Sequence, residues 1–255
     1  MAPSLLSLGT KPILVQIRSR INLQVTNIKI NSNKKLSIAA ILAAVTYSSW
    51  PLGYIFNSSA SKSALASALE GLHQPYNWVF ISLDIISSAL VIYIAVNLWQ
   101  KYKLSKQSFI LTYIVSNLVI FVLGTLVDAL LPEKCMPGTL NCPSWRVDHL
   151  LFIHGIFSIV SAISLFLILL IIWWRNRTSL FNLLILGYII FAMLTLYEAV
   201  YPASSNFSQH YYLTLCGLWI AVIPYSVSRT YFDDVSSEFS KKSILESSAG
   251  KKPLG

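Results

Sequence analysis

Residues 124–158 read GTLVDALLPEKCMPGTLNCPSWRVDHLLFIHGIFS. The stretch joins the end of one apolar segment, which carries Asp128, to the start of the next, which carries His149 and His154. Ionisable side chains in a membrane-spanning segment are costly unless they are paired or used, so they mark candidate sites. The stretch therefore predicts two transmembrane helices and a polar site where they meet.

The composition around this stretch is that of an integral membrane protein. Hydrophobic residues make up 55% of the 255 residues, and charged residues only 11%. These shares lie above and below those usual for soluble domains. A bundle of spans of about 20 residues each uses most of the chain in one unit. We expect a single all-α domain.

Six apolar segments are long enough to cross the membrane as helices. None of them alternates with the period of two that barrel strands show. The predicted segments are 36–56, 78–99, 108–131, 149–174, 180–201 and 209–228. Together they predict a polytopic bundle of six transmembrane helices over residues 36–229.

The basic residues predict the orientation of this bundle. The N-terminal arm, the turns after the second and fourth segments, and the C-terminal tail hold 16 of the 19 Lys and Arg residues. Cytoplasmic loops carry such an excess, so we expect both termini to be cytoplasmic. The net charge of +9 follows this topology pattern, and we expect no nucleic-acid partner. The expected location is the cytoplasmic or plasma membrane.

The two ends of the chain form separate polar regions. Residues 1–35 are basic and contain no acid. Three interpretations stay open for them: a disordered cytoplasmic arm, an amphipathic segment on the membrane surface, or a mitochondrial-type presequence. The last interpretation would place the protein in an organelle membrane. Residues 230–255 are expected to form a polar cytoplasmic tail.

Ionisable residues within the predicted spans all fall in the outer half of the bundle. Helical spacing aligns several of them with small polar residues, as Asp84 aligns with Ser87 and Ser88. One interpretation is a single polar pocket that opens to the exterior; the other is that these groups only join helices. The candidate ligand-binding residues are Asp84, Asp128, His154, Glu198 and His210.

The loop between the third and fourth segments contains Cys135 and Cys142. On the exterior side, oxidising conditions favour a disulfide between them. The alternatives are free thiols, or a metal bound together with His149, although this cysteine spacing is unlike that of zinc sites. The sequence has no HxxxH or HExxH motif, so we expect no metal and no cofactor. Cys216 is expected to be a small buried residue.

A catalytic mechanism would draw on four residues of the same region. Ser158 could act as a nucleophile only if a base such as His154 and an orienting carboxylate lay beside it. No GxSxG motif marks a nucleophilic serine, and the sequence leaves enzymatic activity undecided. The catalytic candidates are His154, Asp84, Asp128 and Ser158.

Four stretches carry a family resemblance. They are SSWPLGYIFN (48–57), SALASALEGLHQPYNWVFISLDIISSALV (63–91), residues 124–162, and LWIAVIPYSVSR (218–229). Over about residues 38–230 the chain resembles domain-of-unknown-function family 998, six-span membrane proteins mainly of prokaryotes. The resemblance implies six spans and no agreed activity. It singles out Gln74, Pro75, Phe80, Asp84, Asp128, Cys135, Cys142, His154 and Ser158.

The functional prediction is an outward-facing polar pocket that binds a lipid headgroup or a small polar ligand. The acids would supply negative charge, and the histidines adjustable hydrogen-bond donors. The alternatives are a membrane-embedded lipid hydrolase, metal-dependent or not, and an ion- or proton-coupled transporter. Membrane lipids are the expected partners.

Overall fold

The computed structural model describes residues 34–57, 69–71, 74–103, 108–131, 149–200 and 207–249. All regular structure in these ranges is helical, which confirms the predicted all-α class. After an initial helix, Lys34–Tyr47, the elements are η1 (Trp50–Leu52), α2 (Gly53–Phe56), α4 (Asn77–Tyr102), α5 (Ser108–Leu130), α6 (His149–Arg175), α7 (Ser179–Val200) and α8 (Phe207–Ala249).

The helices α4 to α8 are each long and apolar enough to cross a membrane. The initial helix and the η1–α2 segment add a sixth span if the bent pair is counted as one. For α4 to α7, the observed ends lie within three residues of the predicted ones. The chain is therefore a multi-pass membrane protein.

A break at Pro51 interrupts the first of these spans. Proline has no backbone N–H, and its ring clashes with the carbonyl four residues earlier, which here belongs to Tyr47. The initial helix ends at Tyr47, and the η1–α2 segment continues at an angle of 42° to it. The span predicted over residues 36–56 is thus a bent pair of helices, with a break at Ser48 and Ser49 that was not predicted.

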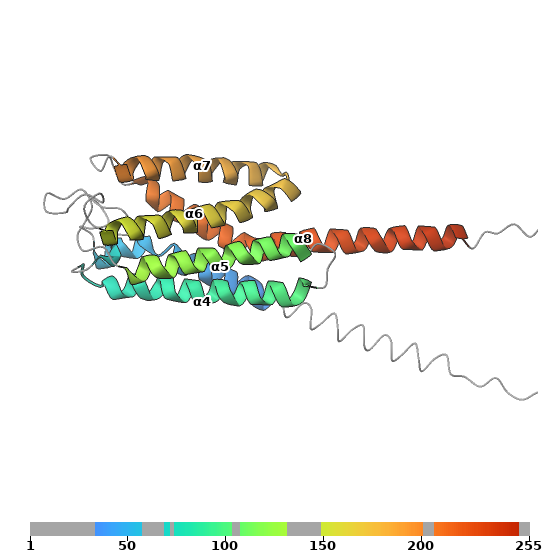
Figure 1. Cartoon of the computed structure of the whole chain (residues 1–255), viewed down its shortest axis with the longest axis horizontal. Helices are drawn as coiled ribbons and strands as arrows, with labels where there is room; N and C mark the ends of the chain where they lie inside the picture. The colour runs from blue at the N-terminus through green and yellow to red at the C-terminus, as the bar shows by residue number, and fades with distance from the viewer. Residues whose placement is uncertain are drawn as a thin grey trace, which may run out of the picture.

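The helices pack around one apolar core (Figure 1). Helix α5 lies between α4 and α6, and α7 packs mainly against α8. Helix α7 is peripheral, because only 11% of the residues in its apolar stretch are buried in the protein, compared with 50% for the apolar stretch of α8. The largest fully buried core side chains include Trp219, Phe121, Leu98, Leu118 and Leu169.

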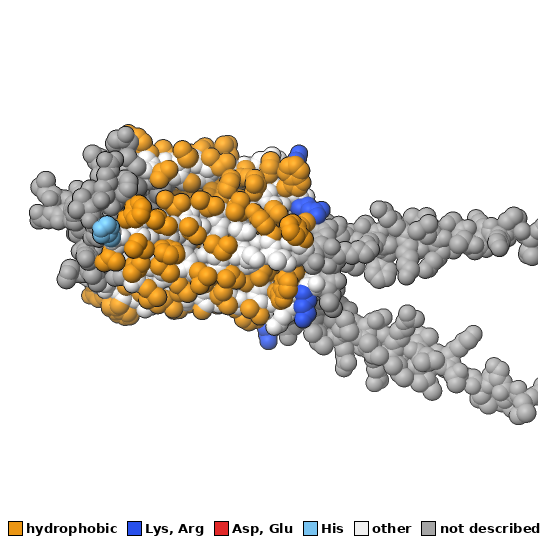
Figure 2. Space-filling model, in the orientation of Figure 1, with side chains coloured by type: hydrophobic (Ala, Val, Ile, Leu, Met, Phe, Trp, Pro, Cys, Tyr) orange, Lys and Arg blue, Asp and Glu red, His pale blue; other side chains and the backbone are white. Residues whose placement is uncertain are grey.

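The outer surface of the bundle has the pattern expected for contact with lipid. Figure 2 shows hydrophobic side chains along its length and the visible Lys and Arg side chains gathered at one end. We call this the basic end; Lys101, Lys103, Arg175 and Arg177 close the helices there or follow them directly. The initial helix begins at this end, and α8 leaves the bundle from it (Figure 1).

Both described ends of the chain thus lie on one side of the bundle, and the cytoplasmic location of that side stays a prediction. Helix α8 continues to Ala249, so most of the predicted polar tail is helical. Residues 1–33, Cys135 and Cys142 lie outside the described residues, and the predicted disulfide stays a prediction.

Candidate functional site

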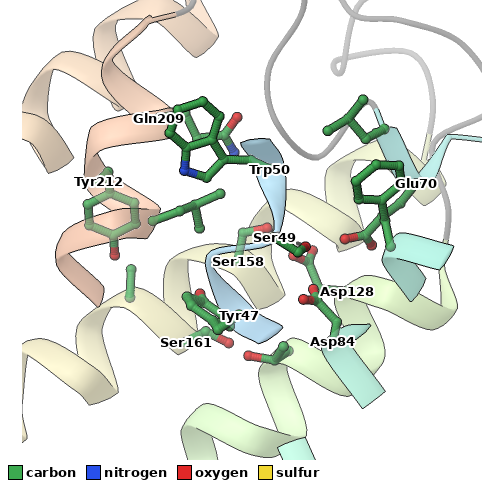
Figure 3. A pocket seen from close by; sticks show the side chains of 15 residues that line it. Tyr47, Ser49, Trp50, Glu70, Asp84, Asp128, Ser158, Ser161, Gln209 and Tyr212 are labelled. Atoms are coloured by element: carbon green, nitrogen blue, oxygen red, sulfur yellow. Dashed lines mark hydrogen bonds between the residues drawn. The ribbon is translucent and has the colours of Figure 1, made fainter. Parts of the chain in front are cut away.

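A cavity of about 90 Å³ lies near the end of the bundle opposite the basic end. It is bordered by the initial helix and η1, by the segment 69–70, and by α4, α5, α6 and α8 (Figure 3). Its lining residues are Tyr47, Ser49, Trp50, Leu69, Glu70, Phe80, Asp84, Thr125, Asp128, Ser158, Ser161, Ala162, Gln209, Tyr212 and Leu213. We call it the outer cavity.

Two backbone features open and shape the outer cavity. The break before Pro51 places Tyr47, Ser49 and Trp50 on its wall, where a continuous helix would present another face. At Gly124, a Cβ atom would overlap the Ser161 hydroxyl oxygen and lie 3.0 Å from the carbonyl oxygen of Phe157. Only glycine therefore permits α5 to approach α6 this closely, and the approach brings Asp128 to the α6 side chains.

Asp128 is the centre of a hydrogen-bonded group that joins α5 to α6. The Ser158 hydroxyl donates to Asp128 Oδ1 at 2.7 Å, and His154 Nδ1 lies 3.0 Å from the same oxygen. His154 Nδ1 is also 3.2 Å from the carbonyl oxygens of Asp128 and Leu131. Because these three oxygens only accept, Nδ1 carries the hydrogen. Asp128 therefore accepts hydrogen bonds from both side chains, and His154 does not lie between Asp128 and Ser158.

Two further carboxyl groups border the same cavity. Figure 3 shows Asp84 beside Asp128, with Glu70 turned toward them. The three groups come from α4, α5 and the segment before α4.

Glu70 was missing from the sequence prediction because it lies outside every predicted span. Its neighbour Leu69 is 1% exposed and packs with Phe80, Trp50 and Leu52, which fixes the segment over the cavity. The sequence around Glu70 carried no specific signal for this position.

The rest of the lining is aromatic and hydroxylic. Tyr47, Trp50, Phe80 and Tyr212 contribute ring surface. Thr125 is 4% exposed, and its Oγ1 atom has no hydrogen-bond partner among the described residues. Buried hydroxyl groups are normally satisfied, so the Thr125 hydroxyl is available to a water molecule or a ligand in the cavity.

Three of the five predicted ligand-binding residues do not line the outer cavity: His154, which contacts the lining residue Asp128, and Glu198 and His210, which lie at the same end. Glu198, on α7, accepts from the hydroxyl and the backbone N–H of Ser208, on α8. His210 is 3% exposed and packs against Trp50, with ring centroids 4.5 Å apart. The structure therefore brings Asp84, Asp128 and His154 together and leaves Glu198 in the α7–α8 hairpin.

Metal coordination has no support in the described part of the chain, where no group of three His, Cys, Asp or Glu side chains is arranged to hold an ion.

Ser161 lines the cavity, but its hydroxyl donates to the Phe121 carbonyl oxygen at 3.2 Å. The chemistry that the lining offers is thus acidic, aromatic and hydroxylic.

Comparison with known proteins adds a family. Neither a curated protein nor a solved structure matches this chain. The model of one family, described as proteins of unknown function (DUF998), matches residues 37–227, which include every helix that borders the outer cavity. The chain therefore belongs to the DUF998 family, as its sequence resemblance predicted.

Proposed function

We propose that the protein binds a positively charged polar group in the outer cavity, and that this group is the ammonium of a lipid headgroup or of a small amine. One observation carries the proposal: the carboxyl groups of Glu70, Asp84 and Asp128 converge on a cavity lined by no Lys or Arg among the described residues. A cation would balance the negative charge of these groups, which is costly to keep away from water and which the His154 imidazole, 3.0 Å from Asp128 Oδ1, can offset at one carboxyl group only.

The other lining groups support an ammonium as the ligand. Cations bind to the faces of Trp and Tyr rings, and Trp50, Tyr47 and Tyr212 offer such rings. The Thr125 hydroxyl can accept a hydrogen bond from an N–H group. A volume of about 90 Å³ suits an ammonium group or a few water molecules rather than a whole lipid headgroup. A lipid would therefore insert only its terminal group.

Hydrolysis by a nucleophilic serine has weaker support. In a Ser-His-Asp triad the histidine lies between the other two residues and takes the proton of the serine. Here the Ser158 hydroxyl donates directly to Asp128, which also accepts from His154. The carboxylate holds both side chains in place, so their arrangement favours binding over attack on an ester.

Transport across the membrane is also less well supported than binding. Between the outer cavity and the basic end, most of the described buried side chains are aliphatic or aromatic, such as Leu118, Leu165 and Ile168, and the buried polar ones, such as Asn117 and Ser226, carry no charge. An ion path needs charged groups or an opening there. The cavity is thus best interpreted as a binding site near one face, which the basic residues predict to be the exterior face of the cell membrane.

The test uses full-length protein in nanodiscs made of phosphatidylglycerol, whose headgroup has no ammonium that could occupy the cavity. Titration calorimetry with ethanolamine tests the small-amine source, and added phosphatidylethanolamine, detected by native mass spectrometry, tests the lipid source. We expect Asp84→Asn and Asp128→Asn each to weaken binding about tenfold or more, because each removes a charged hydrogen-bond acceptor.

Glu198→Gln is the matched control, because Glu198 is an acid at the same end that does not line the cavity. We expect it to retain binding. If neither amine source binds, or if all three variants bind alike, the proposal fails. Binding of free ethanolamine without retention of the lipid would assign the site to small amines.

A further inference from the structure

A second hollow lies far from the outer cavity, between α4 and α5. It is a groove of about 330 Å³ with a largely aliphatic floor, formed by side chains such as Val96, Val115 and Val119. The groove is on the outside of the bundle, since Val96 and Val119 are 47% and 37% exposed. Its surface would face the hydrocarbon of the membrane.

One end of the groove is polar. Trp99 and Gln100, in the last turn of α4, and Thr112, near the start of α5, line it there. Lys101 and Lys103 follow directly in the sequence at the basic end. Tryptophan and lysine at this depth are typical of the boundary between hydrocarbon and headgroups. From Thr112, the groove extends along α5 to Val119, about 10 Å toward the membrane centre at the rise of a helix.

A hydroxyl within the groove is unusual for a surface in contact with acyl chains. Ser116 is exposed and lies one turn deeper than Thr112 on the same face of α5. A polar side chain on a plain lipid-facing surface contributes nothing to lipid solvation. Hydroxyls along a groove can instead bond to the ester oxygens of a lipid whose chain lies in it.

We propose that this α4–α5 groove binds one anionic phospholipid from the leaflet at the basic end. The acyl chain would lie on the aliphatic floor, the ester region beside Thr112 and Ser116, and the phosphate next to the exposed Lys103, which is one turn after Trp99 on the groove side of α4. Lys101 points to the other flank of α4, where its Nζ atom lies over the Tyr102 ring. Charge complementarity decides the occupant: basic side chains at the membrane surface attract anionic lipids, and no acid lines the groove. The proposal is independent of the outer cavity.

The test measures labelling by a photoreactive lipid. Full-length protein is placed in phosphatidylcholine nanodiscs with a small fraction of phosphatidylglycerol that carries a diazirine on one acyl chain. After irradiation, peptide mass spectrometry locates the label. We expect it on α4 and α5 between residues 92 and 119, and we expect an equal amount of diazirine-labelled phosphatidylcholine to label these peptides several-fold less.

Two pairs of variants sharpen the result. Ser116→Phe fills the groove, and Ile120→Phe places the same ring one turn away, on a residue that is 42% exposed and outside the groove lining. We expect only Ser116→Phe to reduce labelling. Lys103→Gln should lower the preference for phosphatidylglycerol about fivefold. Lys101→Gln removes equal charge from the other flank of α4 and should not.

Three outcomes would overturn the proposal. Equal labelling by the two lipids would mean that the groove is covered by bulk lipid. Loss of labelling in both phenylalanine variants would mean that the label reports general surface contact. Disulfide-linked dimers from a Val96→Cys variant, formed at the expense of labelling, would mean that a second copy of the chain occupies the groove. Size-exclusion chromatography of each variant checks that it is folded.

Discussion

Two acidic groups at the same end of the bundle are built in different ways. Asp128 lies between α5 and α6, is 23% exposed, and borders a cavity with two other carboxyl groups. Glu198 lies in the hairpin of α7 and α8, is 8% exposed, and is bonded to Ser208 only ten residues away in the sequence. Asp128 connects helices from distant parts of the chain beside the outer cavity, and Glu198 closes the local hairpin of α7 and α8.

The difference between Asp128 and Glu198 distinguishes a candidate binding group from a structural contact. A carboxylate enclosed by donors from its own hairpin has its hydrogen bonds satisfied and offers little to a ligand. Carboxyl groups from three elements that face one cavity can still interact with a molecule that enters it. The number of acids near a membrane boundary is therefore a poorer guide to function than the number of helices that present them to one space.

The largest expected effect comes from Asp128→Ala. It removes the shared acceptor of His154 and Ser158, and breaking such a buried group costs about 3 kcal/mol or more. Unfolding of purified protein in mixed micelles would measure the loss. Glu198→Ala should cost less, since it affects one hairpin. Equal losses would show that the two acids are equivalent structural contacts.

Gly124→Ala should follow, at about 2 kcal/mol, because the new methyl group would overlap the Ser161 hydroxyl, press against the Phe157 carbonyl and separate α5 from α6. The same unfolding assay measures it. Gly187→Ala in the hairpin meets only a Leu215 side-chain carbon at 3.4 Å and is the matched control. It should be nearly neutral; a loss as large as that of Gly124→Ala would contradict the close approach.

Ser208→Ala is expected to cost about 1.5 kcal/mol, because it removes a hydroxyl donor from a carboxylate that is almost fully enclosed. Ser158→Ala should cost less, since Asp128 keeps His154 as a partner and is partly exposed. The difference between the two unfolding free energies is the quantity to measure. A larger loss for Ser158→Ala than for Ser208→Ala would contradict the view that the hairpin holds the more enclosed carboxylate.

Trp50→Phe has the smallest expected effect. It removes the 3.0 Å hydrogen bond from Trp50 Nε1 to Thr214 Oγ1, worth about 1 kcal/mol, and keeps a ring against His210. In the calorimetric assay, ethanolamine should bind this variant only slightly more weakly. Complete loss of binding would mean that the indole itself contacts the ligand.

Most of the fold could be predicted because hydrophobic length and the positions of Lys and Arg determine where helices cross. The bounds of α4 to α7 followed from that pattern alone. The break at Pro51 was missed because the apolar run continues on both sides of it, although a proline four residues after Tyr47 is a sufficient reason for the helix to end there.

The candidate site was less predictable, because helical spacing gives the depth and face of a residue but not its neighbour. His154 and Ser158 share a face and both reach Asp128, as their spacing suggested. Glu198 has a similar depth, yet α7 packs mainly on α8, which directs it into the hairpin. Thr125 and Tyr212 could not be recognised as lining residues until α5 and α8 were placed.

The length of α8 affects what the C-terminus can reach. Its 43 residues correspond to about 65 Å at the rise of an α-helix, roughly twice the thickness of the hydrocarbon layer. The part after Arg229 spans about 30 Å in continuous helix and acts as a spacer that extends from the bundle. A fluorescent protein fused after Ala249 would report on events well away from the lipid surface.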